Sequence, residues 1–227
     1  NTTGFSRFLT NAGEIENKGI EVLLNATPVE RGDFTWDASL NYTRNRGDVI
    51  SIRDGIEEIV RFEGTGGITY KLVPGGQVGD LYGYAFNRDD ADNLIIGSDG
   101  FPSLNLDTLV KVGNALPNFT AGLTNTFRYK GVGLSVLLEW RDGGDMVDMG
   151  IRNSIRNGLL EQTARRYEEV IFNGVTETGE TNTQPVEITG ETLYRSFARY
   201  NGAAEVILED ASWFRIRRVS VFYDLPK

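Results

Sequence analysis

The sequence predicts an all-β fold, an antiparallel transmembrane β-barrel segment with long external loops and one short loop helix. Three observations support this fold class. Apolar and polar residues alternate along several segments, the connections between these segments are alternately short and long, and aromatic residues gather near the segment ends. The length of 227 residues does not by itself choose between one large domain and two small ones.

The clearest predicted strand runs from Phe34 to Tyr42. Every second residue in it is apolar or aromatic, and Thr, Asp, Ser and Asn lie between them. Just before it, Ile20 to Thr27 alternates in a similar way, and the turn-rich segment Pro28 to Asp33 joins the two runs. Two alternating runs separated by a short turn predict an antiparallel hairpin.

A second hairpin is predicted from Phe119 to Arg141, with its turn at Tyr129 to Gly131. A last strand is predicted from about Ser212 to Tyr223, closed by Leu225 and Pro226. Its alternation changes parity partway along, so we expect a β-bulge near Arg217 that reverses which side chains share a face.

Two long segments separate these strands. Ile52 to Pro117 is rich in glycine and contains a candidate short strand at Leu81 to Phe86, and Asp142 to Asp210 contains a helix predicted from about Ile151 to Tyr167. In membrane barrels the short turns lie on the periplasmic side and the long loops lie outside. Both long segments are therefore predicted to be external, and each must cross the membrane an even number of times, zero included.

A soluble β-sandwich is the alternative that alternation leaves open, because its sheets also have one apolar and one wet face. The positions of the aromatic residues favour the barrel, since membrane barrels have aromatic girdles where strands begin and end. The aromatic residues near predicted strand ends are Phe34, Trp36, Tyr42, Tyr129, Trp140, Trp213 and Tyr223.

Composition excludes several kinds of chemistry. The chain has no histidine and no cysteine, so imidazole or thiolate zinc sites, Ser-His-Asp triads and Cys-His pairs are ruled out. The adjacent acid pairs Glu57–Glu58 and Asp89–Asp90 make poor catalytic pairs, because neighbours on an extended chain point to opposite sides. The formal net charge of −9 argues against a nucleic-acid partner. No enzyme activity and no cofactor is predicted.

Four stretches resemble one protein family in the same order along the chain. Asn11 to Ile52, with its ENKGIE motif and its W-D-A-S-L-N return strand, resembles a strand pair of the TonB-dependent receptors of the SusC/RagA type. VGDLYGYAFN at Val78–Asn87, the stretch Val112–Trp140, and DASWFRIRRVSVFYDLPK at Asp210–Lys227 resemble later parts of the same family.

The resemblance implies a fold, a location and partners. Such receptors are barrels of about 22 strands with an N-terminal plug inside, so residues 1–227 are expected to be part of such a barrel, without the plug and the last strands. Family members reside in the outer membrane as multi-pass barrels, in contact with its lipid. They import oligosaccharides or peptides with energy from a TonB complex that acts through the plug, and a SusD-like surface lipoprotein closes the barrel mouth.

The family often has an Asp-rich, calcium-loop-like element where this chain reads IIGSDGFPSLNLD. Only Asp99, Gly100 and Asp107 match it. We therefore predict a solvated acidic loop there and no metal site.

Candidate site residues follow from the predicted topology. The polar faces of the wall strands are expected to look into the lumen, which places Asp37, Ser39, Asn41 and Glu139 there. External residues are expected to meet the substrate or the lid, because rings stack on sugars and arginines pair with carboxylates. These substrate- or lid-facing candidates are Arg141, Asp142, Asp145, Tyr194, Arg199 and Tyr200.

Other functions remain as alternatives. A soluble carbohydrate-binding or carbohydrate-active β-sandwich fits the alternation, and a passive porin or adhesin-like barrel fits the barrel pattern. They are distinguished by what covers the apolar faces of Phe34–Tyr42 and Val132–Trp140: a second sheet in a sandwich, and lipid in a barrel.

Overall fold

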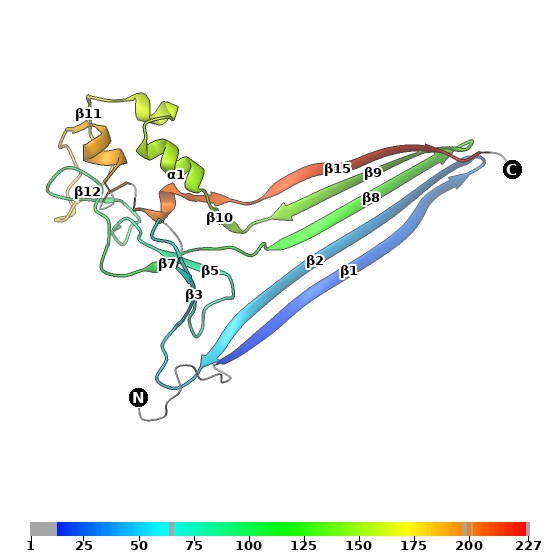
Figure 1. Cartoon of the computed structure of the whole chain (residues 1–227), viewed down its shortest axis with the longest axis horizontal. Helices are drawn as coiled ribbons and strands as arrows, with labels where there is room; N and C mark the ends of the chain where they lie inside the picture. Colours follow the sequence, from blue (N-terminus) through cyan, green and yellow to red (C-terminus); the bar gives the residue numbers. More distant parts are fainter. Residues whose placement is uncertain (1–12, 64–65, 197–198, 201, 226–227) are drawn as a thin grey trace, which may run out of the picture.

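The computed structural model describes residues 13–63, 66–196, 199–200 and 202–225 and is built on one five-stranded sheet. Asn11, Thr65 and Pro226, which fall in segments discussed above, lie outside the described residues. The strands follow the order β1, β2, β8, β9, β15, and every neighbouring pair is antiparallel (Figure 1). Their bounds are β1 Gly13–Arg31, β2 Phe34–Ile52, β8 Phe119–Tyr129, β9 Val132–Asp142 and β15 Trp213–Tyr223.

Two tight turns close the sheet at one end. β1 and β2 are joined by Gly32 and Asp33, with Gly32 at a φ of 57°, and β8 and β9 are joined by Lys130 and Gly131 at φ values of 47° and 82°. Positive φ at the first or at both central residues marks the hairpin turns that match strand twist. The first turn was predicted to be longer: Pro28 lies inside β1, at a bulge between Ala26 and Val29, where a residue without an N–H is tolerated.

The apolar side chains form rows across one face of the sheet. Leu24, Leu40, Leu123, Leu138 and Ile216 lie opposite one another from strand to strand. Ile216 is 63% exposed, and among the described residues every buried hydrophobic side chain except Val49 lies outside the five long strands. The sheet is therefore a single layer, and the second sheet that a sandwich requires does not cover this face.

The β-bulge predicted near Arg217 is present. Ile216 pairs with Leu138 and Arg218 pairs with Leu137, which leaves Arg217 as the extra residue. The bulge reverses parity, so Ile216 before it and Val219 after it lie on the same apolar face.

The two long segments lie together at the other end of the sheet (Figure 1). The first folds into a separate four-stranded sheet of order β3-β4-β5-β7, so none of its strands joins the five-stranded wall as a crossing strand. The small strands are β3 Ile59–Glu63, β4 Thr69–Leu72, β5 Asp80–Gly83, β6 Ile95–Ile96, β7 Val110–Asn114, β10 Asp145–Val147, β11 Glu168–Val170, β12 Val175–Thr176, β13 Val186–Ile188 and β14 Leu208–Asp210.

These segments have hydrophobic cores of their own. One buried cluster joins the first segment to the second, since Phe101 packs with Ile155, Val186 and Leu193. A second cluster joins Ile68 and Leu81 to Ala204 and Ile207. The prediction that both long segments lie on the same side of the membrane agrees with this packing.

The predicted helix from Ile151 to Tyr167 is too long. α1 spans Met149–Arg156, and a separate 3-10 helix covers Glu161–Ala164. The chain leaves α1 through Asn157 and through Gly158, whose φ of 70° is incompatible with a continuing helix. Short helical turns also occur at Gly190–Tyr194 and Ala204–Val206. Within the described part of the chain, no helix has the length and apolarity needed to span a membrane.

We expect the two faces of β2 to respond differently to a charge. Leu40 lies near the middle of the apolar face, so Leu40→Arg in the full-length protein should destabilise the folded protein in lipid vesicles by about 2–4 kcal/mol. Ser39→Arg, one residue away on the polar face, is the matched control and should change the stability much less. Denaturant unfolding in vesicles measures both variants, and equal losses would contradict the assignment of the apolar face to lipid.

Candidate functional site

The polar face of the five-stranded sheet brings together residues from all of its strands. Asp37, Ser39 and Asn41 alternate along β2, and Glu139 lies on the same face because it pairs with Gly122, which in turn pairs with Asn41. A Cβ at Gly122 would lie 2.3 Å from the Asn41 side-chain oxygen, so glycine leaves room for that amide. The four predicted lumen-facing residues thus share one face.

The Glu139 carboxylate accepts hydrogen bonds from two neighbouring arginines. Arg215 donates to it through two nitrogens at 2.8 and 3.0 Å, and Arg217 donates at 2.8 and 3.1 Å. Arg217 is the bulge residue, so the bulge lets both arginines reach one carboxylate. The Arg215 guanidinium also lies 4.2 Å from the centre of the Trp213 ring. Two cations on one acid leave this part of the polar face with a surplus positive charge.

A second charged group lies toward the tight turns. Asp37 accepts hydrogen bonds from Thr27 at 2.8 Å and from Arg128 at 2.5 Å, which connects β1, β2 and β8. An open groove of about 300 Å³ runs beside it. Its polar lining consists of Asn25, Thr27, Asp37, Ser39, Thr124 and Thr126. Hydroxyl and amide groups in this number suit hydrogen bonding to another polar surface or to water.

Arg141, Asp142 and Asp145 form the junction between the wall and the loops. Arg141 donates to the Ala115 carbonyl at 3.2 Å, Asp142 accepts from the Asn118 amide at 3.0 Å, and Asp145 accepts from the Asn114 backbone N–H at 2.7 Å. All three predicted mouth residues therefore hold the chain that enters β8. Their contact with a substrate or a lid stays a prediction.

Tyr194, Arg199 and Tyr200 lie together inside the loops. Tyr194 is 7% exposed, donates its hydroxyl to the Gln162 carbonyl at 2.8 Å and meets the Tyr200 ring edge-on at 5.8 Å. Burial raises the pKa of both tyrosines. Arg199 bonds the Asp99 carboxylate at 2.9 Å and stacks on the Phe101 ring at 4.1 Å, so it ties the second long segment to the first.

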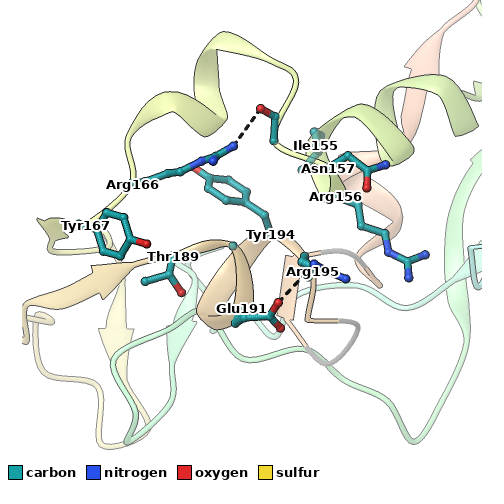
Figure 2. Close-up of a pocket in the computed structure, with 11 residues that line it drawn as sticks. Ile155, Arg156, Asn157, Arg166, Tyr167, Thr189, Glu191, Tyr194 and Arg195 are labelled. Carbon is teal, nitrogen blue, oxygen red and sulfur yellow. Dashed lines mark hydrogen bonds and ion pairs between the residues drawn. The ribbon is translucent and has the colours of Figure 1, made fainter.

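A pocket of about 430 Å³ lies beside Tyr194. Figure 2 shows it between the end of α1, Arg166–Tyr167 and the turn Thr189–Arg195. Arg166 donates to the Gly158 carbonyl at 3.0 Å, and Arg195 pairs with Glu191 at 3.4 Å. Rings and guanidinium groups recognise sugars and carboxylates, so this pocket is a candidate ligand contact. Of the lining residues, only Tyr194 was predicted from the sequence as a site residue, because the others come from separate loop turns.

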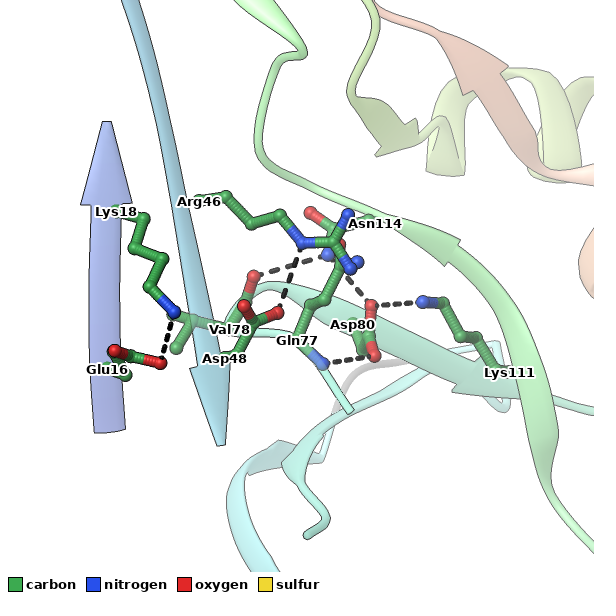
Figure 3. Close-up of polar contacts among 9 residues, drawn as sticks. All are labelled: Glu16, Lys18, Arg46, Asp48, Gln77, Val78, Asp80, Lys111 and Asn114. Carbon is green, nitrogen blue, oxygen red and sulfur yellow. Dashed lines mark hydrogen bonds and ion pairs between the residues drawn. The ribbon is translucent and has the colours of Figure 1, made fainter. Parts of the chain in front are cut away.

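Asp80 is a structural residue that the sequence analysis missed. It is 1% exposed and accepts hydrogen bonds from the Gln77 N–H at 2.8 Å and the Asn114 amide at 2.8 Å. The Lys111 ammonium lies 2.7 Å away (Figure 3). This carboxylate joins β5 to β7 beside the wall. The stretch Val78–Asn87 was noted only for its family resemblance, and an acid at a strand start has no local signal for burial.

We expect Asp80→Ala to loosen this part of the loops. The change leaves the partners of the carboxylate without an acceptor, at a cost of about 1–3 kcal/mol. Hydrogen exchange of the full-length protein should show faster exchange at the Gln77 and Asn114 amide regions, with the five-stranded wall unchanged. Asp90→Ala, which removes an exposed acid of the same segment, is the control and should leave these regions protected. Unchanged exchange in Asp80→Ala would refute the bracing role.

The region compared above with a calcium loop has other partners. Asp99 accepts from the Phe101 N–H at 3.1 Å as well as from Arg199, and the Asp107 N–H donates to the Asn105 side chain at 3.0 Å. Within the described ranges, no group of three or more Asp, Glu, His or Cys side chains is placed to hold a metal ion.

The fold defines a class of protein. A single-layer antiparallel sheet with an apolar outer face, tight turns at one end and folded loops at the other is a segment of a transmembrane β-barrel.

The sequence of this segment is similar to those of several known proteins. TonB-dependent receptor P3 of Formosa agariphila is 24% identical over 99% of this chain and 23% of its own length, and receptor P26 of the same organism is 26% identical over the same shares. TonB-dependent receptor SusC of Bacteroides thetaiotaomicron is 41% identical over 23% of this chain and 5% of its own length. No family model matches the chain. The predicted resemblance is confirmed: the chain is related to the SusC/RagA-type TonB-dependent receptors.

Solved structures show the same fold. The RagAB peptide importer in its closed-closed state superposes with a TM-score of 0.62 at 17% identity, over 99% of this chain and 24% of that chain. Its open-open state gives a TM-score of 0.65 at 18% identity, over 94% of this chain and 23% of that chain. The chain thus spans about a quarter of the length of the proteins it matches.

Proposed function

We propose that this chain forms wall strands and external loops of an outer-membrane importer that takes up a nutrient with energy from TonB. The observation that carries the proposal is the asymmetric sheet: tight turns at one end, both long segments folded at the other, and an apolar face left uncovered between them. The relationship to TonB-dependent receptors supports it. In this orientation Asp37, Ser39, Asn41 and Glu139 face the lumen.

The substrate class proposed is an oligosaccharide or a peptide. The rings and arginines of the loop pocket suit either ligand, since tyrosine stacks on a sugar and arginine pairs with a peptide carboxylate. In the same proposal a SusD-like lipoprotein covers the loop end, and TonB acts through a plug. Arg141, Asp142, Asp145, Arg199 and Tyr200 would act mainly by holding the loops in the shape that meets the ligand or the lid.

The competing functions have less support. A sandwich would cover the apolar rows with a second sheet, yet Leu24 is 57% and Val221 74% exposed. The acid pair Asp89–Asp90 does not form a catalytic site, because Asp89 closes its own turn by accepting from Ala91 and Asn93. Hydrogen bonds from Asn93 lower the pKa of Asp89, whereas a general acid needs a raised one.

The topology is tested with two single-cysteine variants of the full-length receptor, since this chain has no cysteine of its own. Asp90→Cys, in the folded loops, should react with a membrane-impermeant maleimide on intact cells. Lys130→Cys, in the tight turn, should react only after the outer membrane is opened, because the turn faces the periplasm. Labelling of Lys130→Cys on intact cells would overturn the orientation.

The transport activity is tested by uptake of labelled oligosaccharides and labelled peptides. Cells lacking the receptor should lose uptake of one of the two classes, and removing TonB should abolish the same uptake in cells that have the receptor. The class that is lost identifies the substrate. Uptake that persists without TonB would instead indicate a passive pore.

A further inference from the structure

The loop end of β1 and β2 has a row of cations on the apolar face. Tyr42 is the last aromatic residue of that face on β2, and Arg44 and Arg46 follow it at the same parity. On β1, Lys18 lies directly opposite Arg46. No bulge interrupts this pairing between Leu24 and Glu16, so the three cations continue the face that holds Leu24 and Leu40.

The distance along the strand places these cations at the edge of a hydrocarbon layer. Arg44 is ten residues beyond Phe34, which is about 33 Å along a strand at about 3.3 Å per residue. A strand tilted by about 40° rises about 25 Å over that length, which is the height of the apolar band of a membrane barrel. If Phe34 marks one boundary, Arg44 marks the other, and Arg46 and Lys18 lie just beyond it.

The acids that accompany these cations lie farther out. Glu16 bonds Lys18 at 2.7 Å and Asp48 bonds Arg46 at 3.1 Å, as Figure 3 shows, and each acid is two residues farther from Tyr42 than its partner. Within the described residues, no ion-pair partner lies beside Arg44. From the apolar band outward, the face therefore presents rings, then cations, then acids.

A small pocket adjoins the two arginines. It measures about 100 Å³ and lies between the end of β2 and the chain that enters β8. Gln77 lines it as the bridge partner of Asp48 and accepts from Arg46 Nε at 3.0 Å in the amide orientation that satisfies both groups. Asn118 lines the other side. Arginine forks and amide N–H groups are the donors that recognise phosphate.

On the basis of the membrane orientation proposed above, we propose that Arg44, Arg46 and Lys18 form a binding site for the phosphorylated headgroup of an outer-leaflet lipid. The guanidinium groups of Arg44 and Arg46 hold the phosphate, and the rings below them pack against the acyl chains. Tyr42, Phe119 and Trp140 supply those rings, with centroids 5.4 and 5.0 Å apart along the row. Cations at this depth favour anionic headgroups.

The experiment uses the purified full-length receptor in detergent and measures retained lipid by native mass spectrometry. Lipid A, a phosphorylated glycolipid, is titrated against phosphatidylethanolamine, and inorganic phosphate is added as a competitor. We expect lipid A to be retained preferentially, with Arg44→Gln/Arg46→Gln binding it on the order of 30-fold more weakly, about fivefold for each charge. The control Arg53→Gln/Arg61→Gln removes two exposed arginines outside the pocket and should bind as the unmodified receptor does.

Two results would overturn the lipid site. One is equal retention of lipid A by the two double variants, and the other is complete displacement of the lipid by millimolar inorganic phosphate, which would indicate a site for a free anion. The cysteine labelling of Asp90 and Lys130 is read in the same variants. Correct labelling without selective lipid binding removes only the lipid site, whereas reversed labelling removes the importer topology as well.

Discussion

The antiparallel pairing of five strands is the constraint on which the rest of the structure depends. Inside a membrane every backbone N–H and C=O must be bonded within the protein, so a wall strand has no freedom to leave the ladder. Pairing fixes which residues share a face. One extra residue would place every following side chain of that strand on the opposite face of the sheet. The bulges at Thr27–Pro28 and Arg217 occur where the sequence changes parity, and each returns Val29 or Val219 to the apolar face.

Apart from the backbone hydrogen bonds of the sheet, the hydrophobic packing of the protein comes from the loops. The wall has almost no buried side chains of its own, whereas both long segments contribute to two hydrophobic clusters. A polar bridge from Arg141 of β9 to the Ala115 carbonyl then connects this body to the wall, and Asp145 holds the Asn114 backbone of β7 next to it. A rigid attachment of this kind positions the loop pocket relative to the lumen. In the proposed importer, a ligand bound at the loops would therefore be mechanically connected to the shape of the mouth.

The sequence predicted the parts of the fold that depend on period-two alternation. The wall strands, the two tight connections and the Arg217 bulge all have local signals that survive in the structure. The loops were harder to predict, because strands of two or three residues such as β6 and β10 pair with partners that are distant in the sequence and leave no periodicity. The helix prediction ran past Gly158 because a weak apolar stripe continued after the backbone had turned. Asp80 was missed because its burial depends on Asn114 and Lys111, more than 30 residues away in sequence.

The order of residue types along β2 also limits how the proposed wall can sit in a bilayer. Sliding the strand outward would draw the polar tight turn behind Phe34 into hydrocarbon, and sliding it inward would bring Arg44 into hydrocarbon, where the cost of an arginine rises from about 0–1 kcal/mol near the interface to about 2–4 kcal/mol at the midplane. Lys130 and Asp33 set a similar polar limit at the tight turns. A charged group at each end of the same apolar face thus opposes movement in both directions. In the proposed orientation, the sequence of this hairpin and of its neighbour therefore limits the depth of the wall, whatever passes through the lumen.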